Sequence, residues 1–416
     1  PPYNTGNDFI YPDNYSESLR TYLEYTGQVD AEGRKFGTNT DADGRFHSKW
    51  LNMMYPRLYL ARNLLRENGV IFISIDDNEV DNLKKVCSEI FGEENFIASV
   101  IWQKVYSPKN SAKHFSEDHD YVLLFARNAE TWRPALLPRT EEMEARYDNP
   151  DDDPRGPWKP GDLSARNYYS EGTYAVTCPS GRVIERPPSG RYWAISKKKF
   201  DELDKDNRVW WGVDGNNVPA IKRFLSEVKQ GRVPQTLWKY EEVGHTQEAK
   251  KELLASVTFP DSDSVFETPK PTRLIRRMLQ LATKPDEDAI VLDFFAGSGA
   301  TLHAVLKQNS EDGGDRRCIV VQLPEPLPNA GDGHLKTIAD ITKERVRRVI
   351  QKLNNEDAGK LDLDGDNKQD RGFRVFKLDE SNFKPWNAEV PHDTAALKDQ
   401  LDMHVEHIRE GRAADD

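Results

Sequence analysis

The stretch "VLDFFAGSGATLHAV" at residues 291–305 decides the fold. An apolar strand runs directly into Gly297-Ser298-Gly299, and a segment with helical spacing follows. Glycines allow close backbone approach to a ligand, and the first turn of a helix offers N–H groups that lack intrahelical partners. A phosphate-binding P-loop would need Gly-Lys-Ser/Thr, and a dinucleotide fingerprint would need a third glycine where Leu302 stands. The pattern therefore predicts a strand–turn–helix unit for a different, nucleotide-like ligand.

Asp293, at the end of that strand, indicates which ligand this is. A carboxylate repels pyrophosphate but accepts hydrogen bonds from an ammonium group. The methionine part of S-adenosylmethionine carries an ammonium, which Asp293 would accept from, and a carboxylate, which N–H groups near Gly297 and Gly299 would bind. The next strand ends at Gln322, with Glu325 close by, where ribose hydroxyls are commonly bound. Taken singly, a tight turn or a polar strand end explains each residue better.

The remaining pattern predicts an α/β protein. The runs "VIFISID" (70–76) and "YVLLFAR" (121–127) are typical of buried strands in a parallel sheet, and "FRVFKL" (373–378) predicts another strand. Helices are predicted over 48–69, divided or kinked by Pro56 and ended by Gly69, and over 76–92, capped by Asp76 or Asp77 and stopped by Gly92. Further predicted segments are a helix at 269–283 with Pro271 in its first turn, helices at 334–354 and 393–411, a loop at 106–120, and a linker, "DNPDDDPRGP", at 148–157.

Charge is distributed unevenly along the 416 residues, which have a net charge of −12. The window 155–240 carries 16 Lys+Arg against 9 Asp+Glu, whereas the rest carries 42 against 61. The same window holds five of the nine tryptophans. A basic, aromatic-rich insert favours a polyanion-binding face, although an ordinary domain with surface lysines explains it equally well.

Composition excludes several classes of protein. The length fits two or three domains, and no apolar run could span a bilayer, so no membrane partner is expected. The three cysteines lie far apart, which argues against a disulfide framework or a zinc cluster and suits a reducing cytosol. The acidic stretches at 39–44 and 362–367 lack the Glu of a calcium loop, so no metal site is predicted. The basic stretch "KERVRRVIQK" (343–352) could contact phosphates, but an amphipathic surface helix explains it equally well.

The opening stretch "PPYNTG" (1–6) has the chemistry of a catalytic turn. Two prolines fix the backbone and remove N–H donors, so their carbonyls can accept hydrogen bonds from an exocyclic amine. Such bonds draw the amine nitrogen toward tetrahedral geometry and free its lone pair. Tyr3 could stack on a base that has been swung out of a helix. A proline-rich terminus explains "PPY" better when it is considered alone.

Both stretches together, in this order, resemble the β-class amino-methyltransferases of DNA, which carry Asp-Pro-Pro-Tyr and Phe-x-Gly-x-Gly. Pro1-Pro2-Tyr3 and Phe295-Ala296-Gly297-Ser298-Gly299 match these motifs. The stretches "WLNMMYPRL", "GVIFISIDDNE", "FETPKPTRLI" and "VQLPEP" are similar to the modification (Mod) subunit of Type III restriction–modification systems. The resemblance implies a Rossmann-like S-adenosylmethionine-dependent methyltransferase sheet with an inserted target-recognition domain. The expected domains are the catalytic-loop half (1–130), the target-recognition insert (131–265), the cofactor-loop half (266–355) and a C-terminal extension (372–416).

The resemblance also assigns roles to residues. Pro1 and Pro2 would accept hydrogen bonds from the target amine, and Tyr3 would stack on the flipped base. The cofactor-binding residues it implies are Asn4, Thr5, Thr268, Lys270, Pro271, Asp293, Phe295, Ala296, Gly297, Ser298, Gly299, Thr301 and Gln322. The family carries an Asp directly before Pro-Pro-Tyr, so we expect the chain to be part of a longer protein, truncated at both ends. Without that Asp the loop lacks its side-chain acceptor, and the sequence alone does not separate adenine from cytosine.

The function implied by the resemblance is adenine-N6 methylation of double-stranded DNA with S-adenosylmethionine, in the cytoplasm of a bacterium or archaeon. A second Mod subunit and a helicase–nuclease restriction subunit are the implied partners. The predicted DNA-binding residues are Lys109, Lys113, Arg166, Arg182, Arg191, Arg208, Lys222 and Arg223. Two alternatives are an amino-methyltransferase for cytosine, RNA or protein, and a DNA-specificity module without catalysis.

Overall fold

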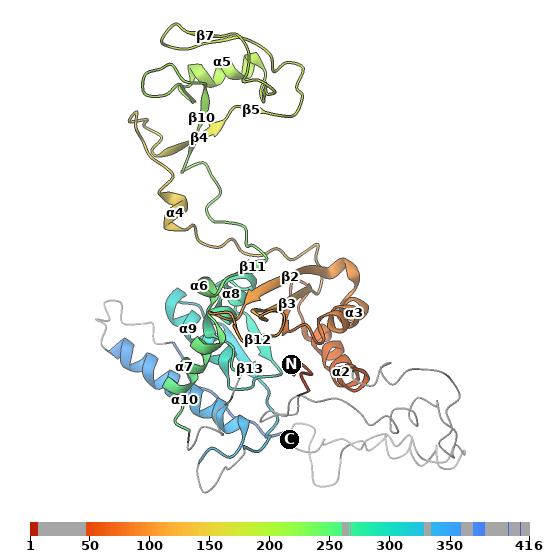
Figure 1. Ribbon diagram of the computed structural model, residues 1–416. Coiled ribbons are helices and arrows are strands. Elements are labelled where there is room, and N and C mark those ends of the chain that lie inside the picture. The colour runs from red at the N-terminus through yellow and green to blue at the C-terminus, as the bar shows by residue number, and fades with distance from the viewer. Residues whose placement is uncertain are drawn as a thin grey trace, which may run out of the picture. The chain divides into compact units, whose positions relative to one another are not determined.

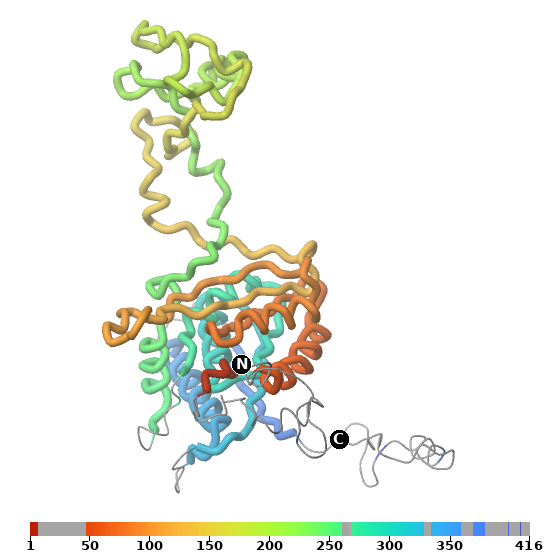
Figure 2. Tube along the Cα trace, turned by 45° about the vertical axis from the view of Figure 1, so that its right-hand side comes forward, coloured from red at the N-terminus to blue at the C-terminus, as the bar shows by residue number. Residues whose placement is uncertain are grey.

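The computed structural model describes residues 1–6, 47–259, 266, 268–327, 334–358 and 369–378, and Lys398 and Ile408 singly. The chain divides into two compact units, Pro1–Leu363 and Asp364–Asp416, which are described separately. The tube in Figure 2 follows the chain from its red N-terminus through the first unit. No helix among the described residues is long and apolar enough to cross a membrane.

The central sheet has the strand order β1-β3-β2-β11, and Figure 1 labels its strands β2, β3 and β11. Its strands are β1 (Val70–Ile75), β2 (Phe96–Gln103), β3 (His119–Ala126) and β11 (Leu237–Trp238). Both predicted apolar runs form strands, but the expectation of parallel pairing was wrong, because β3 runs antiparallel to both β1 and β2. Only β11 lies parallel to its neighbour, β2. A continuous apolar run indicates that both faces of a strand are covered, which does not fix the direction of its neighbours.

Two helices cover one side of this sheet. α2 (Ser48–Leu64) and α3 (Val80–Phe91) pack against β1 and β3 in a core cluster that includes Trp50, Leu58, Ile73, Leu83 and Phe125. α2 passes through Pro56 as one helix and ends at Leu64, before the predicted stop at Gly69. Pro56 lies on the exposed side of the helix. Because proline has no N–H, one backbone carbonyl lacks its donor within the helix, and water can donate a hydrogen bond to it instead. α3 stops at Gly92 as predicted, but its N-cap is Glu79 rather than Asp76 or Asp77.

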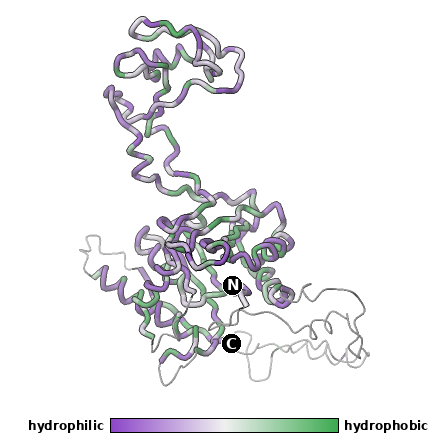
Figure 3. The backbone as a smooth tube through the Cα atoms, in the orientation of Figure 1, coloured by the Kyte–Doolittle hydropathy of each residue, from purple (hydrophilic) through white to green (hydrophobic). Residues whose placement is uncertain are grey.

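The second half of the body contains the predicted strand–turn–helix unit. β12 (Ile290–Asp293) and β13 (Arg317–Val320) pair in parallel and are joined through α9 (Ala300–Asp312). α8 (Thr272–Ala282) precedes them, with Pro271 as its N-cap rather than in its first turn. α10 (Ile338–Ala358) follows, and apolar and polar residues alternate along it (Figure 3). Its apolar side is buried, as expected for an amphipathic helix on a core.

The insert forms a small structure of its own. Its elements are α4 (Glu141–Glu144), β4 (Trp158–Asp162), β5 (Ser164–Ala165), β6 (Val176–Thr177), β7 (Val183–Ile184), β8 (Tyr192–Trp193), α5 (Lys197–Lys205), β9 (Val209–Trp210) and β10 (Ala220–Phe224). Residues 148–157, predicted to be a linker, are instead built into it. Asp153 is buried, and Asp148 forms an antiparallel bridge with Trp158. An internal charge network orders this polar stretch, and composition does not reveal such a network.

The chain enters and leaves the insert through paired segments, since Leu137 and Arg232 form an antiparallel bridge. It then returns through β11, which pairs with β2, through α6 (Tyr240–Val243), and through α7 (Thr246–Ser256), which packs against α10.

The second unit offers little regular structure among its described residues. Residues 373–378 were expected to form a strand, but none is present over 369–378, and Phe376 is 83% exposed. No partner strand covers this apolar run within the described residues, so its pattern alone does not make it a strand. The predicted helix at 393–411 and the acidic stretches at 39–44 and 362–367 lie outside the described residues, apart from Lys398 and Ile408.

Candidate active site

The N-terminal turn is fixed through its second proline. Trp50 is fully buried on α2, and its indole Nε1 donates a hydrogen bond to the Pro2 carbonyl at 3.0 Å. Figures 1 and 2 both show the red N-terminal residues next to α2. The Pro2 carbonyl, predicted to accept from a target amine, therefore also accepts from Trp50, and a carbonyl oxygen can accept two hydrogen bonds.

Asn4 is held by a buried carboxylate. Its backbone is left-handed, with φ at +58°, and its Nδ2 donates to Glu79 Oε1 at 2.6 Å. Glu79 is fully buried and also binds His47 Nδ1 at 2.8 Å and Asn82 Nδ2 at 2.9 Å. A buried carboxylate is tolerated when its oxygens are paired in this way. Glu79 therefore anchors the turn that follows Tyr3, while Thr5 lies beyond it, half-buried.

Charged groups surround the ring of Tyr3. Its hydroxyl donates to Asp120 Oδ2 at 3.4 Å, and Asp120 Oδ1 pairs with Lys104 Nζ at 2.6 Å. Lys270 Nζ lies 4.7 Å from the Tyr3 ring centroid and 5.7 Å from that of Trp102. A cation over an aromatic face is attracted by the ring. Lys270, predicted to bind a cofactor, is thus brought to the catalytic turn.

Asp76 lies at the end of β1, near this group of charges. Burial, with a smaller contribution from the nearby Asp120 carboxylate, raises the pKa of the Asp76 carboxyl to about 6, against the lowering effects of Asn78 and Lys104. A carboxyl group that titrates near neutrality beside a candidate catalytic turn is characteristic of functional sites, and also of structural charge clusters.

The glycine turn is stabilised by its own side chains. Asp293 Oδ1 accepts from the Phe295 N–H at 3.0 Å, and Asp293 Oδ2 accepts from the Thr301 hydroxyl at 2.6 Å. Gly297 and Gly299 have φ values of +51° and +76°, a region that favours glycine. Ala296, which precedes Gly297, and Ser298, which lies between the two glycines, are buried. The carboxylate predicted to receive an ammonium group therefore also organises the loop.

The N–H groups of Gly297 and Gly299 both have hydrogen-bond partners. Gly297 N–H donates to Gln322 Oε1 at 2.7 Å, and Gly299 N–H donates to the Ala296 carbonyl at 2.8 Å. Gln322 Nε2 in turn donates to Glu325 Oε2 at 2.7 Å. Gln322, predicted to contact a ribose, thus links the glycine turn to Glu325. Burial raises the pKa of Glu325, against the lowering effect of the hydrogen bond from Gln322.

The catalytic turn and the glycine turn share neighbours in two places. Tyr3 and Phe295 pack against the same core cluster, the one that contains Trp50 and Ile73. Phe266 packs on the glycine turn, since a Cβ built on Gly297 would lie 3.1 Å from its ring. Lys270 reaches Tyr3 from only four residues further along, and four residues span about 14 Å at most. Turns separated by some 290 positions in sequence are therefore linked through shared neighbours in the fold. Of their flanking residues, Pro271 is buried and Thr268 is exposed.

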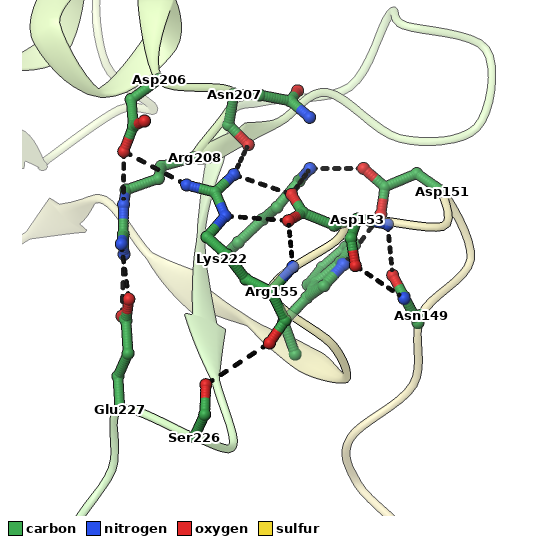
Figure 4. Close-up of polar contacts among 11 residues, drawn as sticks. Asn149, Asp151, Asp153, Arg155, Asp206, Asn207, Arg208, Lys222, Ser226 and Glu227 are labelled. Atoms are coloured by element: carbon green, nitrogen blue, oxygen red, sulfur yellow. Dashed lines mark hydrogen bonds and ion pairs between the residues drawn. The ribbon is translucent and has the colours of Figure 1, made fainter.

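The predicted DNA-binding residues fall into two groups. Lys222 is 1% exposed and pairs with Asp151 and Asp153, so its assignment to DNA contact was wrong (Figure 4). Arg191 pairs with Asp162, and Arg208 pairs with Asp206 and Glu227, so both are committed to contacts within the insert. The exposed members are Lys109, Lys113, Arg166, Arg182 and Arg223.

The tryptophans of the insert window also have structural roles. Trp158, Trp193, Trp211 and Trp238 are buried, and Trp210 packs against Trp158 with ring centroids 5.0 Å apart. The aromatic content that suggested a nucleic-acid surface is therefore mainly core. Among the described residues no group of His, Cys, Asp and Glu could hold a metal ion.

Comparison with known proteins identifies the family. The family model for DNA methylase matches residues 1–325. The chain is 38% identical to the StyLTI Mod subunit of a Type III restriction-modification enzyme from Salmonella typhimurium, over 91% of this chain and 56% of that protein. It is 31% identical to the EcoPI Mod subunit of Escherichia phage P1, over 90% of this chain and 60% of that protein. The chain thus spans somewhat more than half the length of these Mod subunits.

A Type II methyltransferase is also similar. M.KpnI of Klebsiella pneumoniae is 31% identical over 84% of this chain and 80% of its own length. A solved complex of M1.HpyAVI with SAM aligns over 71% of this chain and 82% of that chain, at 12% identity and a TM-score of 0.31, which is too low to support an argument. The family match and the relatives above agree: this chain belongs to the family of N6- and N4-amino DNA methylases.

Proposed function

We propose that this chain carries the methyltransferase of a Type III restriction–modification system, which methylates the N6 amine of a flipped adenine in double-stranded DNA. The observation that supports this proposal is that the catalytic turn and the glycine turn pack against shared neighbours: Tyr3 and Phe295 on one core cluster, and Phe266 and Lys270 from one short segment. A methyl donor held by one turn would face an amine held by the other.

The residues fit S-adenosylmethionine as the methyl donor. The glycine turn brings backbone close to a ligand, and Asp293, Gln322 and Glu325 place carboxylate and amide groups at the ends of β12 and β13. Glu325 would accept hydrogen bonds from ribose hydroxyls, and Asp293 would hold the loop while its field favours the ammonium group. When bound, this group supplies a sulfonium methyl, the electrophile of the transfer.

The catalytic turn would prepare the amine. The Pro1 carbonyl accepts a hydrogen bond from the adenine N6 amine, which localises the nitrogen lone pair for attack. Tyr3 stacks on the base, with Lys270 over its ring and Asp120 at its hydroxyl to restrict its orientation. Rate enhancement then comes from positioning and from fixed acceptors.

A labelling experiment tests this function. The full-length protein is incubated with duplex DNA and methyl-labelled S-adenosylmethionine, and the DNA is digested to nucleosides. We expect label in N6-methyladenine. Label in N4-methylcytosine would identify the other amine that this family methylates. Cofactor binding without transfer to any base would instead favour a specificity module and would overturn the proposal.

The similarity to Type III Mod subunits supports a proposal about partners. We propose that the full-length protein forms a dimer and binds a helicase–nuclease restriction subunit in a bacterial or archaeal cytoplasm. Light scattering of the purified protein, alone and with the restriction subunit of its own system, should give a dimer and then a larger complex. A monomer that does not bind this subunit would contradict the proposal.

A further inference from the structure

The helix α10 lies beyond residues 1–325, the part of the chain that the DNA methylase family model matches. It nevertheless contacts the glycine turn with two side chains, Thr342 and Arg345, which lie one helical turn apart. Both are buried. Arg345 belongs to the basic stretch 343–352, whose sequence is equally consistent with phosphate contact and with a plain surface helix.

Thr342 is bound to both glycines of the turn. Its hydroxyl donates to the Gly297 carbonyl at 2.6 Å, closer than the 3.3 Å to the Ile338 carbonyl within its own helix. Its methyl group occupies the space beside Gly299, because a Cβ built on Gly299 would lie 2.9 Å from Thr342 Cγ2. Thr342 thus holds the Gly297 peptide by a hydrogen bond and the Gly299 backbone by van der Waals contact.

Arg345 lies beneath the same turn and is fully buried. Its Nη1 donates to Ser298 Oγ at 3.1 Å, and its Nε donates to His303 Nδ1 at 3.2 Å. Its Nη2 lies 3.9 Å from Glu252 Oε2 and has no hydrogen-bond acceptor among the described residues. The guanidinium therefore joins Ser298 of the glycine turn to α9 and α7.

The ionisation states of Arg345 and His303 agree with that geometry. Burial lowers the pKa of Arg345 to about 10, so it remains a cation at neutral pH. Burial and the nearby Arg345 lower the pKa of His303 to about 3, so its imidazole is neutral and Nδ1 can accept the hydrogen bond. Arg345 also adds positive charge near the N-terminus of α9, where the helix dipole already favours a carboxylate.

We propose that Thr342 and Arg345 are positioning residues that hold the glycine turn in its ligand-binding conformation. Through these two residues, α10 sets the affinity of the site for S-adenosylmethionine and S-adenosylhomocysteine. This inference rests on the proposed function of the turn. It assigns to the cofactor site a helix, α10, that lies outside the residues matched by the family model. The exposed basic residues of the same helix, Arg347 and Arg348, take no part in it.

Calorimetric binding of S-adenosylhomocysteine tests the proposal through two variants at one position. Thr342→Val keeps the shape but removes the hydroxyl, and we expect roughly tenfold weaker binding, the usual effect of leaving a buried carbonyl unpaired. Thr342→Ser keeps the hydroxyl and should bind within about threefold of the unchanged protein. Arg347→Met, on the exposed side of α10, is the matched control and should leave the affinity unchanged.

Steady-state kinetics separate positioning from general stability. For Thr342→Val, KM for S-adenosylmethionine should rise roughly tenfold while KM for DNA stays constant. Arg345→Met should act in the same direction, provided that its melting temperature shows a folded protein; if it does not fold, the Thr342 pair decides.

Equal affinity of Thr342→Val and Thr342→Ser would overturn this inference and leave the proposed function standing. Failure of the unchanged protein to bind S-adenosylhomocysteine would overturn both.

Discussion

At the scale of single residues, the catalytic turn depends on side chains that contact no substrate in the proposed mechanism. Trp50 fixes the Pro2 carbonyl, and Glu79 fixes Asn4. A catalytic backbone carbonyl cannot be aimed by its own side chain, so neighbouring groups must aim it. Trp50 and Glu79 therefore control where the Pro1 carbonyl points.

Replacement of Trp50 by Phe should lower kcat. The substitution keeps an aromatic ring in the core but removes the N–H that binds the Pro2 carbonyl, so the turn loses its fixed orientation. We expect kcat to fall roughly tenfold, with the Kd for S-adenosylmethionine within about twofold. The matched control is Trp238→Phe, which loses an indole hydrogen bond to the Gln235 carbonyl away from the turn. Equal kcat losses in both variants would contradict the role given to Trp50.

Asp76 should make stability depend on pH in a predictable direction. Its pKa in the folded protein is about 6, above the ordinary 3.8, so the folded state binds the proton more tightly than the unfolded state. The folded protein therefore loses stability as pH rises from about 4 to 6, and this loss is complete above 6. Asp76→Asn should remove the effect and gain about 1 kcal/mol at pH 7.5 relative to pH 5, after allowance for solvent screening.

Urea unfolding at pH 5 and pH 7.5 checks this, with Asp77→Asn as the exposed control next to it. A difference between Asp76→Asn and the unchanged protein that is the same at both pH values would contradict the raised pKa.

Site residues whose type is unusual for their position in the chain could be predicted from the sequence. Site residues whose type is ordinary for their position could not. Two glycines after a strand and two prolines before a tyrosine are each weak patterns alone, and both turns were interpreted through the resemblance of the two together to the amino-methyltransferases. Trp50 looks like an ordinary core residue, and Glu79 looks like an ordinary surface residue at a helix start. Their hydrogen bonds join residues that are 48 and 75 positions apart in the sequence. A hydrogen bond between such distant residues leaves no local pattern.

At the scale of elements, the insert is held by a buried charge network (Figure 4). Lys222 pairs with Asp151 and Asp153, and hydrogen bonds from Arg155 hold the pKa of Asp153 well below its usual range. The network therefore contributes stability at neutral pH that begins to be lost as pH falls below about 4. Charged residues in this stretch resemble a linker by composition, and only the fold shows which of them pair.

Neighbouring residues on β10 should respond differently to the same substitution. Lys222 is buried and Arg223 is exposed on the opposite face of the strand. Lys222→Met leaves Asp151 without its cation and leaves Asp153 with Arg155 alone, and it should destabilise the insert by about 3–5 kcal/mol. Arg223→Met should change stability by less than about 0.5 kcal/mol. Limited proteolysis should cut the insert rapidly only in Lys222→Met, and equal protection of both variants would contradict the buried network.

Strand direction and helix role are the element-level features that sequence did not provide. Both apolar runs were identified as strands, but the antiparallel pairing of β1 and β3 depends on the connection between them and not on their composition. α10 was identified from its spacing as a helix, yet the inward position of Arg345 among five basic residues depends on the register of its packing.

At the scale of the whole molecule, cofactor binding and DNA binding should be separable. Arg166, Arg182 and Arg223 are exposed on the insert, far in sequence from the glycine turn. Replacing all three with alanine should reduce the slope of log Kd for DNA against log salt by up to about 3, if each contacts one phosphate. Affinity for S-adenosylhomocysteine should not change. An unchanged salt slope would contradict DNA contact by this surface.

The central claim is that two turns distant in sequence form one site, with a methyl donor on one side and an amine acceptor on the other. A crystal structure of the full-length protein with sinefungin, a stable analogue of S-adenosylmethionine, tests it most directly. We predict that the analogue lies on the Gly297–Gly299 turn, with the amine that replaces the sulfonium methyl facing Pro1 and Tyr3. An analogue bound away from either turn, or facing away from Tyr3, would contradict the account.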